Sequence, residues 1–141
     1  MADRILVPYD GDGLSNRALE FALEEFPDAD VTVLHVVEIP SGEIAEIVGP
    51  DLRPPLSDRA DAYAADLLED AKAIAEEYDR PIETAVDRGR PEHRIVEHAA
   101  DGAYDVLVVG GHGREPLSRA LLGSVAEKVV RRSPIPVVVV R

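Results

Sequence analysis

A glycine-marked segment behind a short apolar run is the part of this sequence best suited to chemistry. The run Val106–Val109 is followed by glycines at positions 110, 113 and 123, and Ser124 comes directly after the last of them. Glycine lets the backbone turn with positive φ and approach a ligand without interference from a Cβ atom, so main-chain amides can point at an anion. The spacing therefore predicts a loop that holds phosphate groups.

The far end of this loop supplies a second set of donors. Ser124 and Glu127 have the S-x-x-E spacing of a capping box, which predicts that Ser124 caps a helix. The N–H groups and the positive dipole end of that helix would face the same loop. Glycine after a strand and a capping serine also occur in purely structural turns. Such a turn needs only a few residues, however, and the longer spacing here favours phosphate binding.

Three side chains inside the loop are further candidates. Arg114 and Arg119 suit phosphate oxygens because a guanidinium is planar and permanently charged, although a solvated surface arginine is the alternative for each. His112 lies between the glycines, where it could act as a general base or simply face solvent.

The elements that must position this loop follow from hydrophobic periodicity. Several apolar runs have consecutive apolar residues, which is typical of a parallel sheet covered by helices on both faces. The predicted strands are Arg4–Pro8, Val31–Val37, Pro81–Val86, Val106–Val109 and Ile135–Val140. Helical patterns alternate with these runs, so the predicted fold class is α/β, a doubly wound sheet formed by one domain over residues 1–141.

The helical patterns predict amphipathic helices that flank the sheet. The first buries Leu19 and Leu23, and the second begins near Ser57 with Tyr63 on its apolar face. A third follows Pro91 and a fourth follows Ser124. Ligands of doubly wound sheets bind at the carboxyl ends of the strands, where the strand order reverses.

The glycine spacing resembles the nucleotide-binding signature of the universal stress protein family, in its ATP-binding branch. The resemblance covers nearly the whole chain and includes the segments Ile5–Gly11, Val33–Val37, Gly89–Val96 and Ser133–Val140. It implies a five-stranded parallel sheet of order 3-2-1-4-5, similar to the adenine nucleotide alpha hydrolase-like fold. In that order the ends of the first and fourth strands meet at the ligand crevice.

The resemblance also assigns roles at the site. Asp10 would contact the nucleoside, although an Asx turn before Gly11 is the structural alternative. Main-chain groups of Val36 would meet the adenine edge, and the same residue would look identical as plain core. The full set of implied nucleotide-binding residues is Asp10, Val36, Gly110, Gly113, Arg114, Gly123 and Ser124. The implied ligand is ATP, or ADP or AMP, and no catalytic residue is assigned.

Asp12 departs from the family pattern, which commonly has serine at this position. A second carboxylate near phosphates is unfavourable at low effective dielectric constant. Mg²⁺ or Mn²⁺ bound between phosphates and water would relieve the repulsion. The alternative is that Asp12 points to solvent.

Composition excludes several classes of function. The net charge is −13, which argues against nucleic-acid binding because that needs basic surface. The chain has no cysteine, so disulfides and thiolate chemistry are excluded. No apolar run approaches the roughly 18 residues of a membrane helix, and residues 1–4 lack the features of a signal peptide. We therefore expect a cytoplasmic protein without a membrane partner.

Two segments predict contacts outside the nucleotide site. The final apolar run would leave an edge strand that soluble proteins usually cover, and the resemblance implies a homodimer joined through that strand. The stretch 38–56 is too long for an ordinary connection, which favours a mobile flap or a partner-contact loop, or else an inert insertion.

Three functions remain open at this stage. The first is an ATP-binding regulatory module of the stress response, because the sequence lacks the GxxxxGK[ST] lysine and an arranged catalytic base. The second is a slow ATPase or nucleotidyl-transfer enzyme on the same scaffold. The third is an interaction protein that binds no nucleotide.

The acidic composition predicts a dependence of stability on salt. Lysine occurs only at positions 72 and 128, which with the excess of acids resembles a salt-adapted protein. Repulsion among carboxylates is relieved in molar salt, where the screening length falls to about 3 Å. We expect the melting temperature to rise from dilute buffer to molar KCl in a thermal scan. A melting temperature that stays flat would contradict this expectation.

Overall fold

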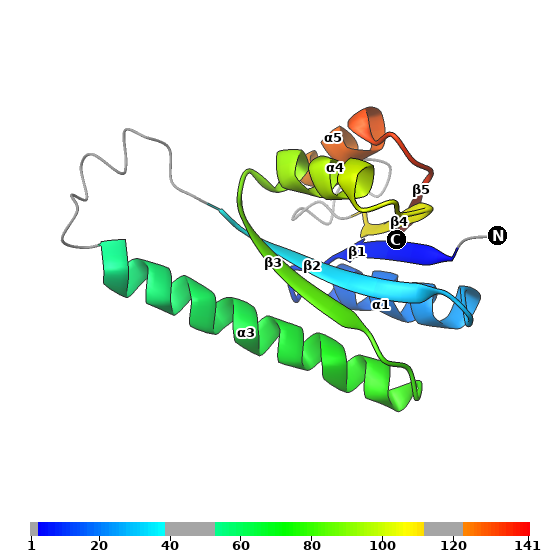
Figure 1. Cartoon of the computed structure of the whole chain (residues 1–141), viewed down its shortest axis with the longest axis horizontal. Coiled ribbons are helices and arrows are strands. Elements are labelled where there is room, and N and C mark those ends of the chain that lie inside the picture. Colours follow the sequence, from blue (N-terminus) through cyan, green and yellow to red (C-terminus); the bar gives the residue numbers. More distant parts are fainter. Residues whose placement is uncertain (1–2, 39–52, 112–122) are drawn as a thin grey trace.

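The strands form one parallel sheet whose carboxyl ends share an edge (Figure 1). The computed structural model describes residues 3–38, 53–111 and 123–141. The sheet has the order β3-β2-β1-β4-β5. Its strands are β1 (Arg4–Pro8), β2 (Asp30–Glu38), β3 (Glu83–Gly89), β4 (Val106–Gly110) and β5 (Val137–Val140). This order and the parallel pairing confirm the predicted fold class.

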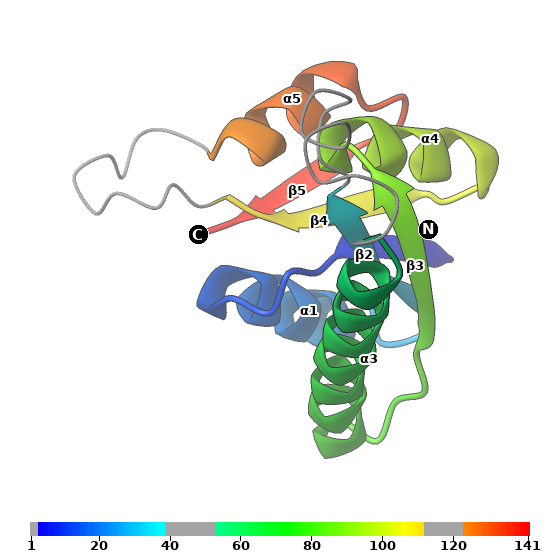
Figure 2. The ribbon, with the colours of Figure 1, turned by 90° about the vertical axis from the view of Figure 1, so that its left-hand side faces the viewer.

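Helices cover both faces of the sheet, as Figure 2 shows. Helices α1 (Gly13–Glu25) and α3 (Arg53–Glu77) lie on one face, and α4 (Pro91–Asp101) and α5 (Ser124–Arg132) lie on the other. Successive strand residues point to opposite faces. In β1, Ile5 and Val7 pack with α1 and α3, whereas Leu6 packs with α4 and α5. This explains why the strands are apolar at consecutive positions.

Several element boundaries differ from the predicted ones, and three of the differences have a local reason. Strand β3 continues to Gly89 because its polar end still pairs with β2, up to Glu38. Strand β5 begins at Val137, because the Ser133 hydroxyl donates to the carbonyl of Ile135 and holds that residue in a turn. Helix α3 begins at Arg53, earlier than Ser57. Prolines 54 and 55 fit its first turn, where N–H groups have no helical partner.

The long stretch after β2 can be assessed only in part. Residues 39–52 lie outside the described part of the chain, so the predicted flap or partner-contact loop stays a prediction. None of the described helices has the length and apolar character needed to cross a bilayer.

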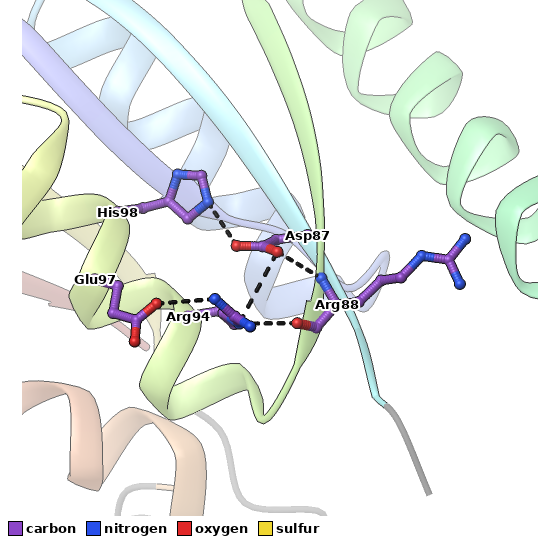
Figure 3. A network of polar contacts seen from close by, with 5 residues as sticks. All are labelled: Asp87, Arg88, Arg94, Glu97 and His98. Atoms are coloured by element: carbon purple, nitrogen blue, oxygen red, sulfur yellow. Dashed lines mark hydrogen bonds and ion pairs between the residues drawn. The ribbon is translucent and has the colours of Figure 1, made fainter.

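A polar network fastens the edge strand β3 to helix α4 (Figure 3). His98 Nε2 lies 2.9 Å from Asp87 Oδ2, and the main-chain N–H of Arg88 donates to Asp87 Oδ1 over 2.8 Å. Arg94 Nε donates to the carbonyl of Arg88 at 2.8 Å, and its Nη1 pairs with Glu97 at 3.0 Å. These contacts fix the position of α4, whose first turn borders the carboxyl edge of the sheet.

Asp87 is the carboxylate at the centre of this network. Its partial burial disfavours the charged form, but the hydrogen bonds from Arg88 and His98 and the charge of Arg94 outweigh that cost and lower the pKa of Asp87. An ionised Asp87 therefore stabilises the folded state. This contribution is complete above the unfolded pKa of about 4 and is lost as the pH falls through the lower folded value.

Replacing Asp87 should make that contribution visible. We expect Asp87→Asn to lower the free energy of unfolding by about 1 kcal/mol near pH 7. The difference from the wild type should shrink below pH 4, where the wild-type carboxylate also loses its charge. Urea unfolding across this pH range measures it. Asp28→Asn, which removes the same charge from an exposed turn, is the control. An equal loss in both variants would contradict a specific role for Asp87.

Candidate functional site

A cleft of about 1360 Å³ opens at the carboxyl edge of the sheet. Its lining includes residues that follow β1 and begin α1, on one face, and residues at the start of α5, on the other. Ligand pockets commonly measure roughly 300–1000 Å³, so the space accommodates a mononucleotide. The crevice predicted from the reversal of strand order is therefore present.

Most of the predicted site residues meet in this cleft. Asp10 reaches it from the end of β1, Val36 from β2 and Gly110 from β4, and Gly123 and Ser124 reach it from the start of α5. Residues 113 and 114, and with them His112 and Arg119, lie outside the described residues. Contact of all these residues with a nucleotide stays a prediction.

The end of β1 is built from local hydrogen bonds. Asp10 Oδ1 accepts from the main-chain N–H of Asp12 at 3.0 Å, so the Asx turn weighed for Asp10 is formed. Gly11 has φ +85°, and a Cβ atom there would lie 2.3 Å from Leu67 Cδ2. Glycine at position 11 is thus required by both conformation and packing. The turn leaves Asp10 exposed beside the cleft.

Asp12 has a structural role that neither sequence interpretation anticipated. It is the N-cap of α1, where its Oδ1 accepts from the N–H of Ser15 at 2.8 Å. A carboxylate at a helix N-terminus interacts favourably with the helix dipole. Its charge is therefore compensated in part by α1, and repulsion of phosphates is weaker than an isolated carboxylate would produce. The described residues contain no cluster of three or more His, Cys, Asp or Glu that could hold a metal ion.

Gly110 is needed for packing and not for an unusual backbone conformation. Among the described glycines, positive φ occurs at Gly11 and Gly89, so Gly110 does not use the positive φ that glycine permits. A Cβ atom on Gly110 would lie 2.8 Å from the main-chain carbon and oxygen of Leu14. Glycine at this position lets α1 approach the end of β4.

The predicted capping role of Ser124 is wrong. Gly123 is the N-cap of α5, Ser124 is the first helical residue, and no capping hydrogen bond from a side chain is present among the described residues. The main-chain N–H of Glu127 donates to the carbonyl of Gly123 at 2.9 Å. The earlier amides of α5 have no partner within the helix, and a helix start without a capping side chain is an ordinary position for an anion.

The most informative geometry lies along β2. Strand β1 ends at Pro8, opposite Leu34, whereas β2 continues to Glu38. The N–H of Asp30 donates to Asp3, and the carbonyl of Leu34 accepts from Tyr9, so the even-numbered residues of β2 turn their main-chain groups toward β1. By the same alternation, the N–H and C=O of Val36 face the space beyond the end of β1. That space is the cleft.

Comparison with known proteins identifies the family to which this chain belongs. Residues 1–141 match the profile of the Universal stress protein family. The chain belongs to this family. It is 33% identical to a universal stress protein of Methanocaldococcus jannaschii (MJ0531), over 98% of this chain and 81% of that protein.

Solved structures of the universal stress protein family share this fold. The universal stress protein UspA from Lactobacillus plantarum superposes with a TM-score of 0.83 at 27% identity, covering 99% of this chain and 98% of that one. A universal stress protein crystallised in complex with cAMP gives 0.74 at 26% identity, covering 99% and 97%.

An aromatic pair at the end of β2 was missed in the sequence. The His35 side chain is 9% exposed, and its Nδ1 lies 2.9 Å from the carbonyl oxygen of Tyr9. Its ring meets Tyr63 of α3 edge-on, with centroids 6.3 Å apart. Tyr63 was predicted to lie in the core, but it is 60% exposed and lines the cleft. Helical periodicity places Tyr63 on the side of α3 that faces the sheet. It cannot show that β1 ends before the level of Tyr63, so that no strand residue of β1 covers the ring.

Tyr9 also lines the cleft, beside His35. Burial, together with the nearby carboxylates of Asp70, Asp10 and Asp12, raises the pKa of the Tyr9 hydroxyl. The hydroxyl therefore stays protonated and donates to Asn16 on α1. Tyr9 is thus uncharged, while Asp10, Asp12 and Glu38 bring negative charge and Arg17 brings positive charge to the cleft lining.

Proposed function

We propose that this member of the universal stress protein family binds an adenine nucleotide, ATP in the first place, in the cleft at the carboxyl edge of the sheet. The observation that carries the proposal is the overhang of β2 beyond β1, which leaves the main-chain N–H and C=O of Val36 facing the cleft. The output of binding would be a change of conformation or of partner affinity, as expected for a regulatory module of the stress response.

The base would pair with the edge of β2. Adenine presents an amino donor next to a ring-nitrogen acceptor, and the C=O and N–H of Val36 offer the complementary acceptor and donor on one side of the strand. A related family member crystallised with cAMP supports an adenine ligand for this chain.

The phosphates would lie across the cleft, at the start of α5. Gly110, Gly113, Gly123 and Ser124 would present amides and a hydroxyl, and Arg114 would add a positive charge. The carboxylates of Asp10, Asp12 and Glu38 line the same cleft. We propose that Mg²⁺ or Mn²⁺ accompanies the nucleotide, since a divalent cation would offset the repulsion between these acids and the phosphates.

We also propose that the chain forms a homodimer through β5, the edge strand next to β4. The carbonyls of Pro136 and Val140 accept from Leu107 and Gly111, so the even-numbered residues of this segment turn toward β4. The main-chain groups of Val137 and Val139 therefore face away from the sheet, where a second copy can pair with them.

The dimer predicts an effect of proline at position 139. Val139→Pro removes an outward N–H without removing a bond to β4, so the fold should survive while the dimer weakens. Sedimentation velocity should show a dimer for the wild type and a monomer for the variant, with unchanged far-ultraviolet circular dichroism. A wild-type chain that sediments as a monomer at high concentration would overturn the proposed dimer.

Nucleotide binding is tested by isothermal titration calorimetry of Mg²⁺–ATP in molar KCl. We expect micromolar affinity for the wild type, about −8 kcal/mol. Gly113→Val should abolish binding, because the side chain restricts the backbone and fills the phosphate space. Ser124→Ala should weaken binding about tenfold by removing a hydroxyl donor. Melting temperatures of both variants control for folding, and full affinity in folded Gly113→Val would refute the role of the glycine loop.

Turnover separates the regulatory module from an enzyme. Steady ATP hydrolysis on the order of one per second would indicate an enzyme. Binding with turnover far below this rate supports the regulatory module. If the wild type binds no nucleotide, the chain is an interaction protein that uses the fold for another purpose.

A further inference from the structure

We infer that Tyr63 of α3 is a base-stacking residue of the nucleotide cleft and that His35 positions its ring. This inference rests on the proposed function, because it assigns a contact for the base that would pair with Val36. It adds α3 to the elements that recognise the ligand.

The orientation of the base follows from the strand that it would pair with. A planar base that bonds to the main-chain edge of Val36 extends the sheet, in the position that β1 would occupy if it continued. Its two faces must then point toward the two faces of the sheet. One face meets the side of α4 and α5, where Ile95 and Val125 line the cleft. The other face meets the side of α1 and α3.

Tyr63 is the exposed aromatic residue on that second side. It lines the cleft and is 60% exposed, whereas the next residue of α3, Ala64, is only 1% exposed. Tyr63 is not part of the core that joins α1 and α3 to the sheet. Its exposure is unexplained by packing within the described chain and matches the surface that a base would cover.

His35 directs this ring toward the space beyond β1. The carbonyl oxygen of Tyr9 lies at the end of β1, so the 2.9 Å contact from Nδ1 leans the imidazole over that end. A carbonyl only accepts, so Nδ1 carries the proton. The His35 ring in turn meets Tyr63 at an interplanar angle of 72°. One flank of the tyrosine is thereby supported, and its exposed surface remains available to a ligand.

An ion pair connects the same turn of α3 to strand β3. Asp61, two residues before Tyr63, pairs with Arg88 on β3. Arg88 also belongs, through its main chain, to the network that ties β3 to α4. The helix turn that carries Tyr63 is thus anchored to the sheet. An aromatic group on an anchored helix loses little freedom when a base stacks on it, and base stacking on aromatic side chains is tolerant of sequence.

The first test measures affinity in the full chain by calorimetry. We expect Tyr63→Ala to weaken ATP and adenosine by the same factor, about tenfold, because the lost contact is to the base they share. Tyr63→Phe keeps the ring and should stay within about twofold of the wild type. Tyr78→Ala removes a tyrosine that directly follows the C-terminal end of the same helix, outside the cleft, and should leave both affinities unchanged.

The second test reads the contact directly. The chain contains no tryptophan, so Tyr63→Trp introduces a single tryptophan at the proposed stacking position, whose indole can be excited selectively at long wavelength. Adenosine should quench its emission with the same concentration dependence as binding, because stacking on a base quenches indole fluorescence. Tyr78→Trp is the matched control and should show no quenching.

The outcomes separate this inference from the proposed function. If the wild type binds ATP but Tyr63→Ala binds it equally well, or if Tyr63→Trp is not quenched at saturation, the stacking role is overturned while nucleotide binding stands. If the wild type binds neither ATP nor adenosine, both are overturned. A loss in Tyr63→Ala that Tyr63→Phe shares would also overturn stacking, because the ring would then be irrelevant.

Discussion

The unequal length of two neighbouring parallel strands is the constraint on which the candidate site depends. Strand β1 stops at Pro8, opposite Leu34, and β2 runs on to Glu38. A strand that outruns its neighbour leaves main-chain donors and acceptors without a strand partner, facing a gap where a ligand can pair with them. In this fold the gap opens into the cleft. The even-numbered residues of β2 turn their main-chain groups toward β1, so the N–H and C=O of Val36 face this gap. A ligand with a planar donor–acceptor edge is a fitting partner.

The packing of the helices makes the gap accessible. Helix α1 leaves β1 on one face and approaches β4 so closely that Gly110 cannot carry a side chain beside Leu14. Helix α5 starts on the other face without a side-chain cap. Because α1 and α5 pack on opposite faces of the sheet, the carboxyl ends of β1 and β4 border the cleft between them. The same arrangement brings a helix N-terminus, where anions are favoured, to the far side of the cleft.

The excess of acidic residues is partly used for structure. Asp12 caps α1, Asp87 accepts from Arg88 and pairs with His98, and Asp105 accepts from the main-chain N–H groups of Asp3 and Arg4. Each carboxylate is placed against N–H donors, so part of the formal repulsion is offset locally. The exposed acids that remain are the ones whose repulsion salt can screen.

Local patterns in the sequence determined the α/β class and the approximate strands, and the family resemblance added the strand order by which Asp10 and Gly110 meet at one crevice. Apolar runs and glycine spacing are properties of neighbouring residues, so they are visible without a structure. The capping role of Ser124 and the burial of Tyr63 were predicted wrongly, and the packing that requires glycine at position 110 was not predicted. Leu14 explains Gly110, and the early end of β1 explains Tyr63. Periodicity gives the repeat of an element but not its register against a partner, and only the tertiary structure decides which groups of β2 face the cleft.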